Sequence, residues 1–198
     1  MKIKSSLFEN NYGINGGVMY FKQFNNHLNE NPIELIDLIF KKNKAEYFGG
    51  VIFSDNEHLN IQNVKNVTFT ENYAYAGGVI YLNNENNEII KNDLLYVNNK
   101  NFIYINNTAE SHGDNYATDP YVIDLINQDI YNIFNRTIKS GDSIPLKFNL
   151  YDEFNQTIND ASKLYSNLGL KINILNNNDS NNYKLYGNSC FYSNGIFI

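Results

Sequence analysis

Carboxylates are the most numerous side chains here that could do acid–base chemistry. On a sugar, such chemistry needs two carboxyl groups held at a fixed separation on one face of the fold. The acidic residues of this chain fall in different predicted turns, and the chain has no Asp-Asp pair. We interpret them as solvated turn residues and expect no catalytic residue among them: Asp37, Asp55, Glu57, Asp93, Asp114 and Asp119.

Metal binding is the second chemistry to consider. Asp114, Asn115 and Asp119 supply hard oxygens within a short stretch, and oxygen is the ligand type that Ca²⁺ prefers. No glycine-centred loop of the EF-hand kind accompanies them. We therefore expect neither a metal nor a cofactor, with a calcium site as the alternative.

Cys190 is the single cysteine of the chain. A lone cysteine excludes an internal disulfide and a cysteine metal site. We expect a small, buried side chain at this position. The alternative is a partner that lies beyond residue 198.

The bulk composition argues against two classes of partner. The 198 residues carry a net charge of −6, and Arg136 is the sole arginine. Nucleic-acid binding needs clustered positive charge, so no nucleic-acid partner is expected. No apolar run approaches the ~20 residues that span a bilayer, and the start, MKIKSSLFENN, lacks the hydrophobic region of a signal peptide. Abundant Asn, Tyr, Phe and Ile favour strands joined by polar turns.

A motif recurs four times over the first two thirds of the chain. It has an aromatic residue, an asparagine three positions later, and a glycine pair further on. The fourth copy is degenerate, with Asp114 in place of the second glycine. Successive copies begin about 28 to 36 residues apart, a period that indicates a repeat architecture. The copies contain Phe8, Asn11, Gly16 and Gly17; Phe40, Asn43, Gly49 and Gly50; Phe69, Asn72, Gly77 and Gly78; and Tyr104, Asn107 and Gly113.

This period fits one rung of a right-handed parallel β-helix, with three short strands and three turns. Equivalent residues then lie over one another, so the aromatic residues form an internal stack and the asparagine amides form a ladder. The glycines supply positive φ and leave room for the neighbouring rung. One segment leaves an alternative open: NPIELIDLIF, residues 31–40, also has the start signals of a helix. We favour a strand there, because its register matches that of Thr68 and Phe69.

The Phe-x-x-Asn and Gly-Gly-Val-Ile elements resemble the repeats of chlamydial polymorphic outer membrane proteins. Similar repeats occur in large surface proteins of Asn-rich microbial eukaryotes, including scaffoldins of anaerobic gut fungi. The resemblance covers about residues 1–119. It implies an extracellular or cell-surface β-helix used for adhesion or scaffolding, and it carries no catalytic residue across.

The sequence pattern changes near Asp129, where the repeat motif is no longer found. We take Gly113 to Pro120 as the exit from the β-helix, and we predict a β-helix over residues 1–126. Strand runs separated by polar turns follow, and they resemble part of an immunoglobulin-like β-sandwich over residues 127–198. Both ends look cut, which suggests a fragment of a longer protein, with a short gene product as the alternative.

The predicted fold is also one that carries polysaccharide lyases and hydrolases. Ser111-His112-Gly113-Asp114 superficially resembles a Gly-His-Gly element of polygalacturonases, but the paired aspartates and the Arg/Lys pair of that family are missing. His112 occupies the position just before the glycines in the other copies, so we interpret it as a turn residue. We therefore expect a non-enzymatic adhesion or scaffold protein. The alternative is an accessory part of a β-helix carbohydrate-active enzyme whose catalytic rungs are missing.

Partners are expected among surface polysaccharides or other surface proteins. Five Asn-x-Ser/Thr sequons are candidate glycosylation sites if the protein is secreted. With asparagine this abundant, several would arise by chance. The five are Asn66, Asn106, Asn135, Asn155 and Asn178.

Overall fold

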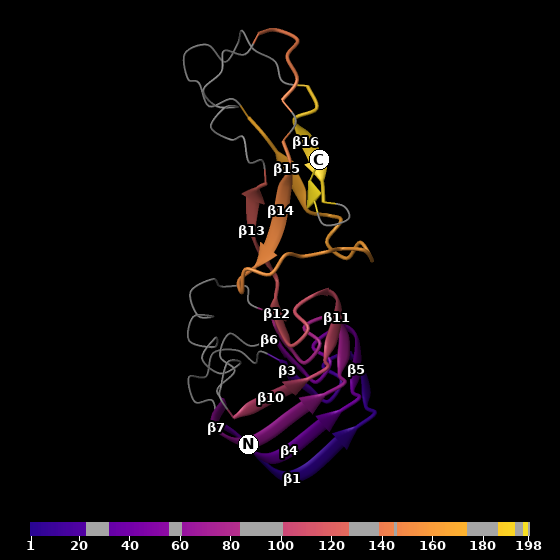
Figure 1. Cartoon of the computed structure of the whole chain (residues 1–198), viewed down its shortest axis with the longest axis vertical. Coiled ribbons are helices and arrows are strands. Elements are labelled where there is room, and N and C mark those ends of the chain that lie inside the picture. Colours follow the sequence, from indigo (N-terminus) through magenta and orange to yellow (C-terminus); the bar gives the residue numbers. More distant parts are fainter. Residues whose placement is uncertain are drawn as a thin grey trace. The chain divides into compact units, whose positions relative to one another are not determined.

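The computed structural model describes residues 1–22, 32–55, 61–83, 101–126, 139–144, 146–173, 186–192 and 196–197. It divides into two compact units (Figure 1). The first unit contains residues 1–121 together with 152–156, and the second contains residues 122–151 and 157–198. The described residues form strands and turns, with no helix among them. The predicted division at residues 126 and 127 stays a prediction.

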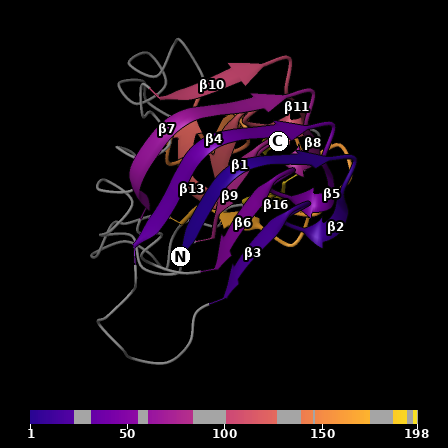
Figure 2. The same cartoon turned by 90° about the horizontal axis from the view of Figure 1, so that it is seen from below.

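The first unit contains three parallel sheets, and each takes one strand from each of four rungs. Figure 2 shows the strands of one sheet lying side by side. This arrangement confirms the predicted all-β parallel β-helix. The first sheet is β1 (Lys2–Glu9), β4 (Ile33–Lys41), β7 (Ile61–Thr70) and β10 (Phe102–Ile105); the second is β2 (Tyr12–Asn15), β5 (Lys44–Phe48), β8 (Tyr73–Ala76) and β11 (Thr108–His112); the third is β3 (Met19–Lys22), β6 (Ile52–Asp55), β9 (Ile80–Leu82) and β12 (Tyr116–Thr118).

The ambiguous segment at residues 31–40 is a strand, β4, in its described part. The alternation of buried and exposed side chains along β4 has one break. Ile33 and Leu35 are buried before the break, and Leu38 and Phe40 are buried after it. The break lies at Asp37, which has a left-handed backbone with φ of 52°. Burial with period two is the pattern of a half-buried strand, so the helix-start signals of this segment are overridden by the pairing of β4 with β1 and β7.

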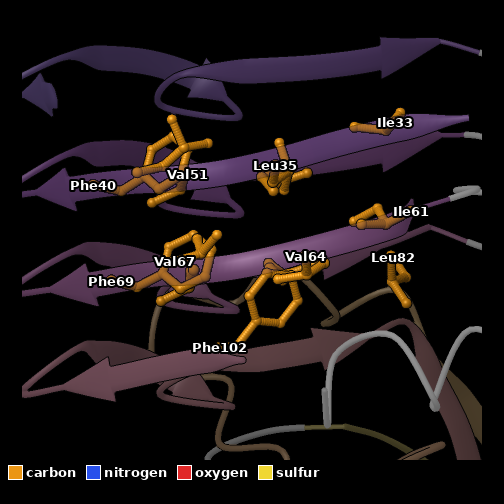
Figure 3. Close-up of a cluster of buried hydrophobic side chains, with 14 residues drawn as sticks. Ile33, Leu35, Phe40, Val51, Ile61, Val64, Val67, Phe69, Leu82 and Phe102 are labelled. Atoms are coloured by element: carbon orange, nitrogen blue, oxygen red, sulfur yellow. The ribbon is translucent and has the colours of Figure 1, made fainter. Parts of the chain in front are cut away.

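The core of the β-helix lies between the first and third sheets. Side chains of equivalent positions in successive rungs stack inside it, and Figure 3 shows them between the strands. Fourteen buried side chains form this cluster. They are Ile33, Leu35, Leu38, Phe40, Val51, Ile52, Ile61, Val64, Val67, Phe69, Val79, Ile80, Leu82 and Phe102.

The predicted exit at Gly113 to Pro120 is wrong for its central part. Tyr116–Thr118 is β12, which pairs in parallel with β9 through Tyr116↔Ile80 and Thr118↔Leu82. The fourth rung therefore completes its third strand. The loss of the second glycine does not end the β-helix early, because that glycine serves contacts with a following rung rather than the rung itself.

The second unit contains two small sheets. The first has the order β13 (Pro120–Leu125), β14 (Phe148–Asp152) and β17 (Ile196–Phe197), and the second pairs β15 (Gly169–Lys171) with β16 (Ser189–Phe191) antiparallel. Leu150, Ile158 and Tyr192 form its buried cluster. The immunoglobulin-like sandwich stays a prediction, and much of the segment that would build it lies outside the described residues.

Candidate functional site

The aromatic residues of the repeat form a continuous column inside the β-helix. Phe8 stacks on Phe40 with ring centroids 5.0 Å apart, and Phe40 stacks on Phe69 at the same distance. Tyr104 continues the column 5.4 Å from Phe69. Phe40 and Phe69 are fully buried. The rings of these two residues are therefore packed against the rungs on both sides, in the stacked geometry that aromatic pairs prefer.

The asparagine of each rung is bonded to the asparagine of the next. The Asn72 Oδ1 accepts the Nδ2–H and the backbone N–H of Asn43, at 3.0 and 2.9 Å. The Asn72 Nδ2 donates to the Asn107 Oδ1 and to the Phe40 carbonyl oxygen, both at 3.0 Å. These four bonds use the hydrogen-bonding capacity of the amide in full, which explains how a polar side chain can be wholly buried here.

Asn11 and Asn107 lie at the two ends of this ladder. The Asn11 Nδ2 donates to the Asn43 Oδ1 at 2.8 Å. At the other end, the Asn107 Nδ2 donates to the Asn115 Oδ1 at 3.2 Å. Asn115 belongs to the same rung as Asn107, so its side chain takes the place of an asparagine from a fifth rung.

The glycine pairs form the corner between the second and third sheets. Gly49 has a φ of +66°, which a residue with a Cβ adopts only at a cost. A Cβ on Gly50 would lie 2.1 Å from the carbonyl oxygen of Gly78 in the next rung. Asp114 holds the same position in the fourth rung, which no fifth rung follows among the described residues. Its carboxylate accepts the backbone N–H of Ala109 at 3.0 Å.

A turn at residues 152–156, which belongs to the first unit, covers the fourth rung. The Gln156 Nε2 donates to the Tyr116 carbonyl oxygen at 2.9 Å, and the Glu153 N–H donates to the Thr118 Oγ1 at 3.0 Å. The Phe154 ring meets the Tyr116 ring edge-on at 4.7 Å. This turn and the side chains of the fourth rung together form what we call the cap: Asp114, Asn115 and residues 152–156.

Several buried or partly buried titratable groups lie at the cap. His112 is buried, with Nδ1 3.0 Å from the Ser111 Oγ and Nε2 3.1 Å from the Thr118 carbonyl oxygen. Burial lowers the pKa of His112 and raises that of Asp152, whose carboxylate accepts the Gln156 N–H at 2.8 Å. Because both ring nitrogens have partners inside the fold, His112 is placed to support the cap rather than to meet a substrate. It is the last residue of β11, not the turn residue that the sequence suggested.

Glu153 is the partly exposed member of this group. Its burial, followed by the charges of Asp152 and Asp119, raises the pKa of its carboxyl to about 7. Asp119 itself accepts the Tyr81 hydroxyl at 2.8 Å. The carboxylates of Asp152 and Asp119 thus both act on that of Glu153 at the cap, and the sequence had placed only Asp119 among the candidates.

The other carboxylates from the sequence are separated. The Asp37 Oδ1 accepts the Asn66 Nδ2 at 2.8 Å, and the Asp55 Oδ1 accepts the Asn83 Nδ2 at 2.7 Å. Glu57 and Asp93 lie outside the described residues. Within the described ranges, no group of three His, Cys, Asp or Glu side chains could hold a metal ion. Asp114, Asn115 and Asp119 each bond a different partner within the fold, as given above.

Three of the candidate glycosylation sites are exposed. Asn66 and Asn106 have left-handed backbones in the β-helix, and Asn155 has one in the turn at the cap. Asn135 and Asn178 lie outside the described residues. Cys190, expected to be buried, is only partly so and packs against the small cluster of the second unit.

A second aromatic column, missed in the sequence, lies on the outer side of the third sheet. Tyr20 stacks on Phe53 at 5.1 Å, and Phe53 stacks on Tyr81 at 5.9 Å. The Phe48 ring lies 4.4 Å from that of Tyr81. The signal was the aromatic residue at the third position after each of the three glycine pairs, Tyr20, Phe53 or Tyr81, which by strand alternation points to the opposite side from the residue before it.

Comparison with known proteins identifies the repeat. Residues 37–55 and 66–83 match the family model of the Chlamydia polymorphic membrane protein repeat. Searches of curated proteins and of solved structures give no match. No helix in the described part of the chain could span a bilayer. The two matched segments hold the aromatic residues, the ladder asparagines and the glycine corners of the second and third rungs, so these two rungs are similar to the Chlamydia polymorphic membrane protein repeat.

Proposed function

We propose that this chain is a non-catalytic, surface-associated repeat segment that serves adhesion or scaffolding, and that it belongs to a longer repeat protein. One observation carries the proposal: the recurrent residues all serve contacts between rungs. The aromatic column fills the interior, the asparagine ladder joins the rungs, and the glycine corners let them approach. Such residues build a rigid spacer and leave the outer faces free for binding.

The proposed location is extracellular or at the cell surface. The family of the repeat supports this, since its name describes membrane proteins. The proposed partners are surface polysaccharides or other surface proteins, and Asn66, Asn106 and Asn155 are proposed glycan acceptors. The comparisons do not bear on the likeness to fungal scaffoldins, which stays a prediction.

The outer face of the second sheet is the part most suited to polar partners. The Tyr12 hydroxyl lies 3.2 Å from the Glu46 Oε2, and the Tyr73 hydroxyl lies 3.3 Å from the Glu110 Oε2. The Lys44 ammonium lies 5.0 Å from the centre of the Tyr73 ring. Such a strip of hydroxyls, carboxylates and ring faces can bind sugars or polar protein surfaces.

The test is to stain intact and permeabilised cells of the source organism with an antibody against this chain, and to incubate the purified chain with surface polysaccharides. We expect staining of intact cells, and binding without release of new reducing ends. Staining only after permeabilisation would contradict the location. Cleavage that is lost when one carboxylate is replaced would contradict the non-catalytic role.

A further inference from the structure

The turn that covers the fourth rung is the tip of a hairpin whose stem belongs to the second unit. In the stem, Tyr151 and Thr157 form an antiparallel bridge. The Ile158 N–H donates to the Leu150 carbonyl oxygen at 2.9 Å, which closes the stem one step further from the tip. We call this hairpin, residues 150–158, the strap.

The tip of the strap is an ordered turn. The Asp152 N–H donates to the Gln156 carbonyl oxygen at 3.1 Å, and the Asn155 N–H donates to the Asp152 carbonyl oxygen at 3.0 Å. The Asp152 carboxylate accepts the N–H and the Nε2–H of Gln156 at 2.8 and 2.9 Å. These bonds lie within the turn, so the tip can leave the rung as one piece.

The contacts that hold the tip on the fourth rung go to β12. The Gln156 Nε2 donates to the Tyr116 carbonyl oxygen at 2.9 Å, beside the ring contact described above. The Glu153 N–H donates to the Thr118 Oγ1 at 3.0 Å, and the Thr118 N–H donates to the Asp152 Oδ2 at 3.4 Å. Because the Thr118 N–H has its acceptor on the strap, its exchange with solvent reports whether the tip is in place.

The stem of the strap is fixed inside the second unit. Leu150 and Ile158 are buried with Tyr192 in the small cluster of that unit. The Tyr192 hydroxyl, 34 positions beyond Ile158, donates to the Ile158 carbonyl oxygen. The Tyr192 N–H donates to the Leu168 carbonyl oxygen at 2.9 Å. Tyr192 therefore ties one arm of the strap to the rest of the second unit.

We propose that the strap is a latch held by the second unit: when the cluster of Leu150, Ile158 and Tyr192 is disturbed, the tip leaves β12 while the inner rungs stay folded. Only Tyr151 and Thr157, one residue on each arm, separate the cluster from the tip. A two-stranded hairpin is marginally stable in water by itself, so the tip stays in place only while its stem is held. The latch requires neither the surface location nor the adhesion role proposed above.

Release of the tip uncovers an edge strand. In the described part of the chain, β12 is the end strand of the third sheet. An exposed edge offers unpaired backbone groups to other chains and invites association. The second unit thus keeps the β-helix closed at its fourth rung, and the strap controls whether this edge is exposed.

The test compares two variants of the full chain that each lose one side-chain hydrogen bond of the second unit. Tyr192→Phe removes the bond to the Ile158 carbonyl oxygen and keeps the ring. Asn188→Ala is the matched control, because it removes a bond of 2.8 Å to the Ile172 carbonyl oxygen, in which no strap residue takes part.

Backbone amide exchange is measured by NMR at Thr118 and, for the inner rungs, at Gly49. In Tyr192→Phe we expect exchange at least about fivefold faster at Thr118, the effect of one lost hydrogen bond at the stem, and unchanged exchange at Gly49. In Asn188→Ala we expect no change at either residue. Unchanged exchange at Thr118 in Tyr192→Phe would overturn the proposal. Equal acceleration of Thr118 in both variants, or of Thr118 and Gly49 in Tyr192→Phe, would overturn it too.

A second measurement locks the stem with a covalent bond. Tyr151→Cys and Thr157→Cys are combined with Tyr192→Ala, and Cys190→Ser removes the natural thiol. Facing residues of an antiparallel pair lie within reach of a disulfide. We expect fast exchange at Thr118 while the thiols are reduced, and slow exchange again once the disulfide forms. Fast exchange in both states would show that the stem does not hold the tip, and slow exchange in the reduced chain would show that the cluster is not needed.

Discussion

The inner rungs and the last rung of this β-helix carry the same motif, but the residues of that motif have different partners in the last rung. Gly50 and Gly78 lie against a carbonyl oxygen of the following rung, whereas Asp114 has no rung to clear and carries a side chain. The amide of Asn72 bonds an asparagine of the next rung, whereas that of Asn107 bonds Asn115 of its own. The comparison teaches that the repeat motif is imposed by the rung that follows, and that it relaxes where a cap replaces that rung.

The largest effect should come from the second glycine of an inner rung. In Gly50→Ala, the new Cβ would lie 2.1 Å from the Gly78 backbone oxygen, which cannot move without breaking the corner. We expect a loss of about 3 kcal/mol or more in the free energy of unfolding, measured by urea denaturation. Asp114→Ala at the equivalent position is the control, with an expected loss of about 1 kcal/mol from one hydrogen bond. Equal losses would contradict the comparison.

The next effect concerns the asparagine ladder. Asn72→Ala removes the bonds of a fully buried amide and leaves the groups of Asn43, Asn107 and Phe40 without partners, so we expect a loss of about 2–4 kcal/mol. Asn11→Ala, at the exposed first rung, should cost about 1 kcal/mol. Urea midpoints of the two variants provide the measurement. A larger loss at Asn11 than at Asn72 would refute a ladder whose strength comes from burial.

The cap should respond to pH through Glu153. Its pKa of about 7 in the fold lies above the ordinary value of 4.5, so the folded state binds the proton more tightly than the unfolded state. The carboxyl therefore stabilises the fold fully below pH 4.5, and this contribution is lost as pH rises to about 7. Glu153→Gln should leave stability unchanged near pH 4 and raise it near pH 8, by less than about 1 kcal/mol because the group is partly exposed.

Thermal melts of the unchanged chain and of Glu153→Gln at pH 4 and pH 8 measure this effect. His112 works in the opposite direction, because its lowered pKa means that stability falls as pH drops below its ordinary value of 6.5. The charged groups around Glu153 and His112, which are Asp119 and Asp152, are unchanged in the Glu153→Gln variant. A Gln variant with the same loss between pH 4 and pH 8 as the unchanged chain would show that Glu153 does not govern the cap.

The smallest expected change in stability concerns the residue before each ladder asparagine, which differs between the inner and the outer rungs. All four residues have left-handed backbones, but the outer rungs have Asn10 and Asn106 where the inner rungs have Lys42 and Glu71. Asparagine tolerates this conformation best after glycine. We expect Lys42→Asn to stabilise the fold by about 0.5–1 kcal/mol, and Lys42→Ala to give no gain. The exposed pair of Lys42 and Glu71, 3.6 Å apart, contributes little.

The sequence was most informative where rungs repeat. Phe40, Asn43 and Gly49 have equivalents at fixed spacing, so one physical explanation accounts for all copies and predicts the register of β4 on β7. The position of His112 beside Ala76 followed from the same alignment. Its burial did not, because that depends on the turn at residues 152–156.

The cap itself could not be predicted, for two reasons. Phe154 and Gln156 occur once, so no repetition marks them, and they lie more than thirty residues beyond the strand that they cover. The breaks in alternation at Ser5, Asp37 and Asn66 were also missed, since their positive φ values occur at residues that share no side-chain type. Asp and Asn tolerate a positive φ better than most residues, but this preference does not by itself locate the break within each strand.

Backbone amide hydrogen exchange at the glycine corners tests the central claim most directly. The N–H groups of Gly49 and Gly77 donate to Ala76 and His112 of the following rungs at 3.0 and 3.1 Å, while among the described residues Gly113, Asp114 and Asn115 have no acceptor for theirs. Measured by NMR, exchange should be slow at Gly49, Gly50, Gly77 and Gly78 and at least about a hundredfold faster at Asp114 and Asn115. Similar rates at the inner corners and the last one would contradict rungs that bond in this register.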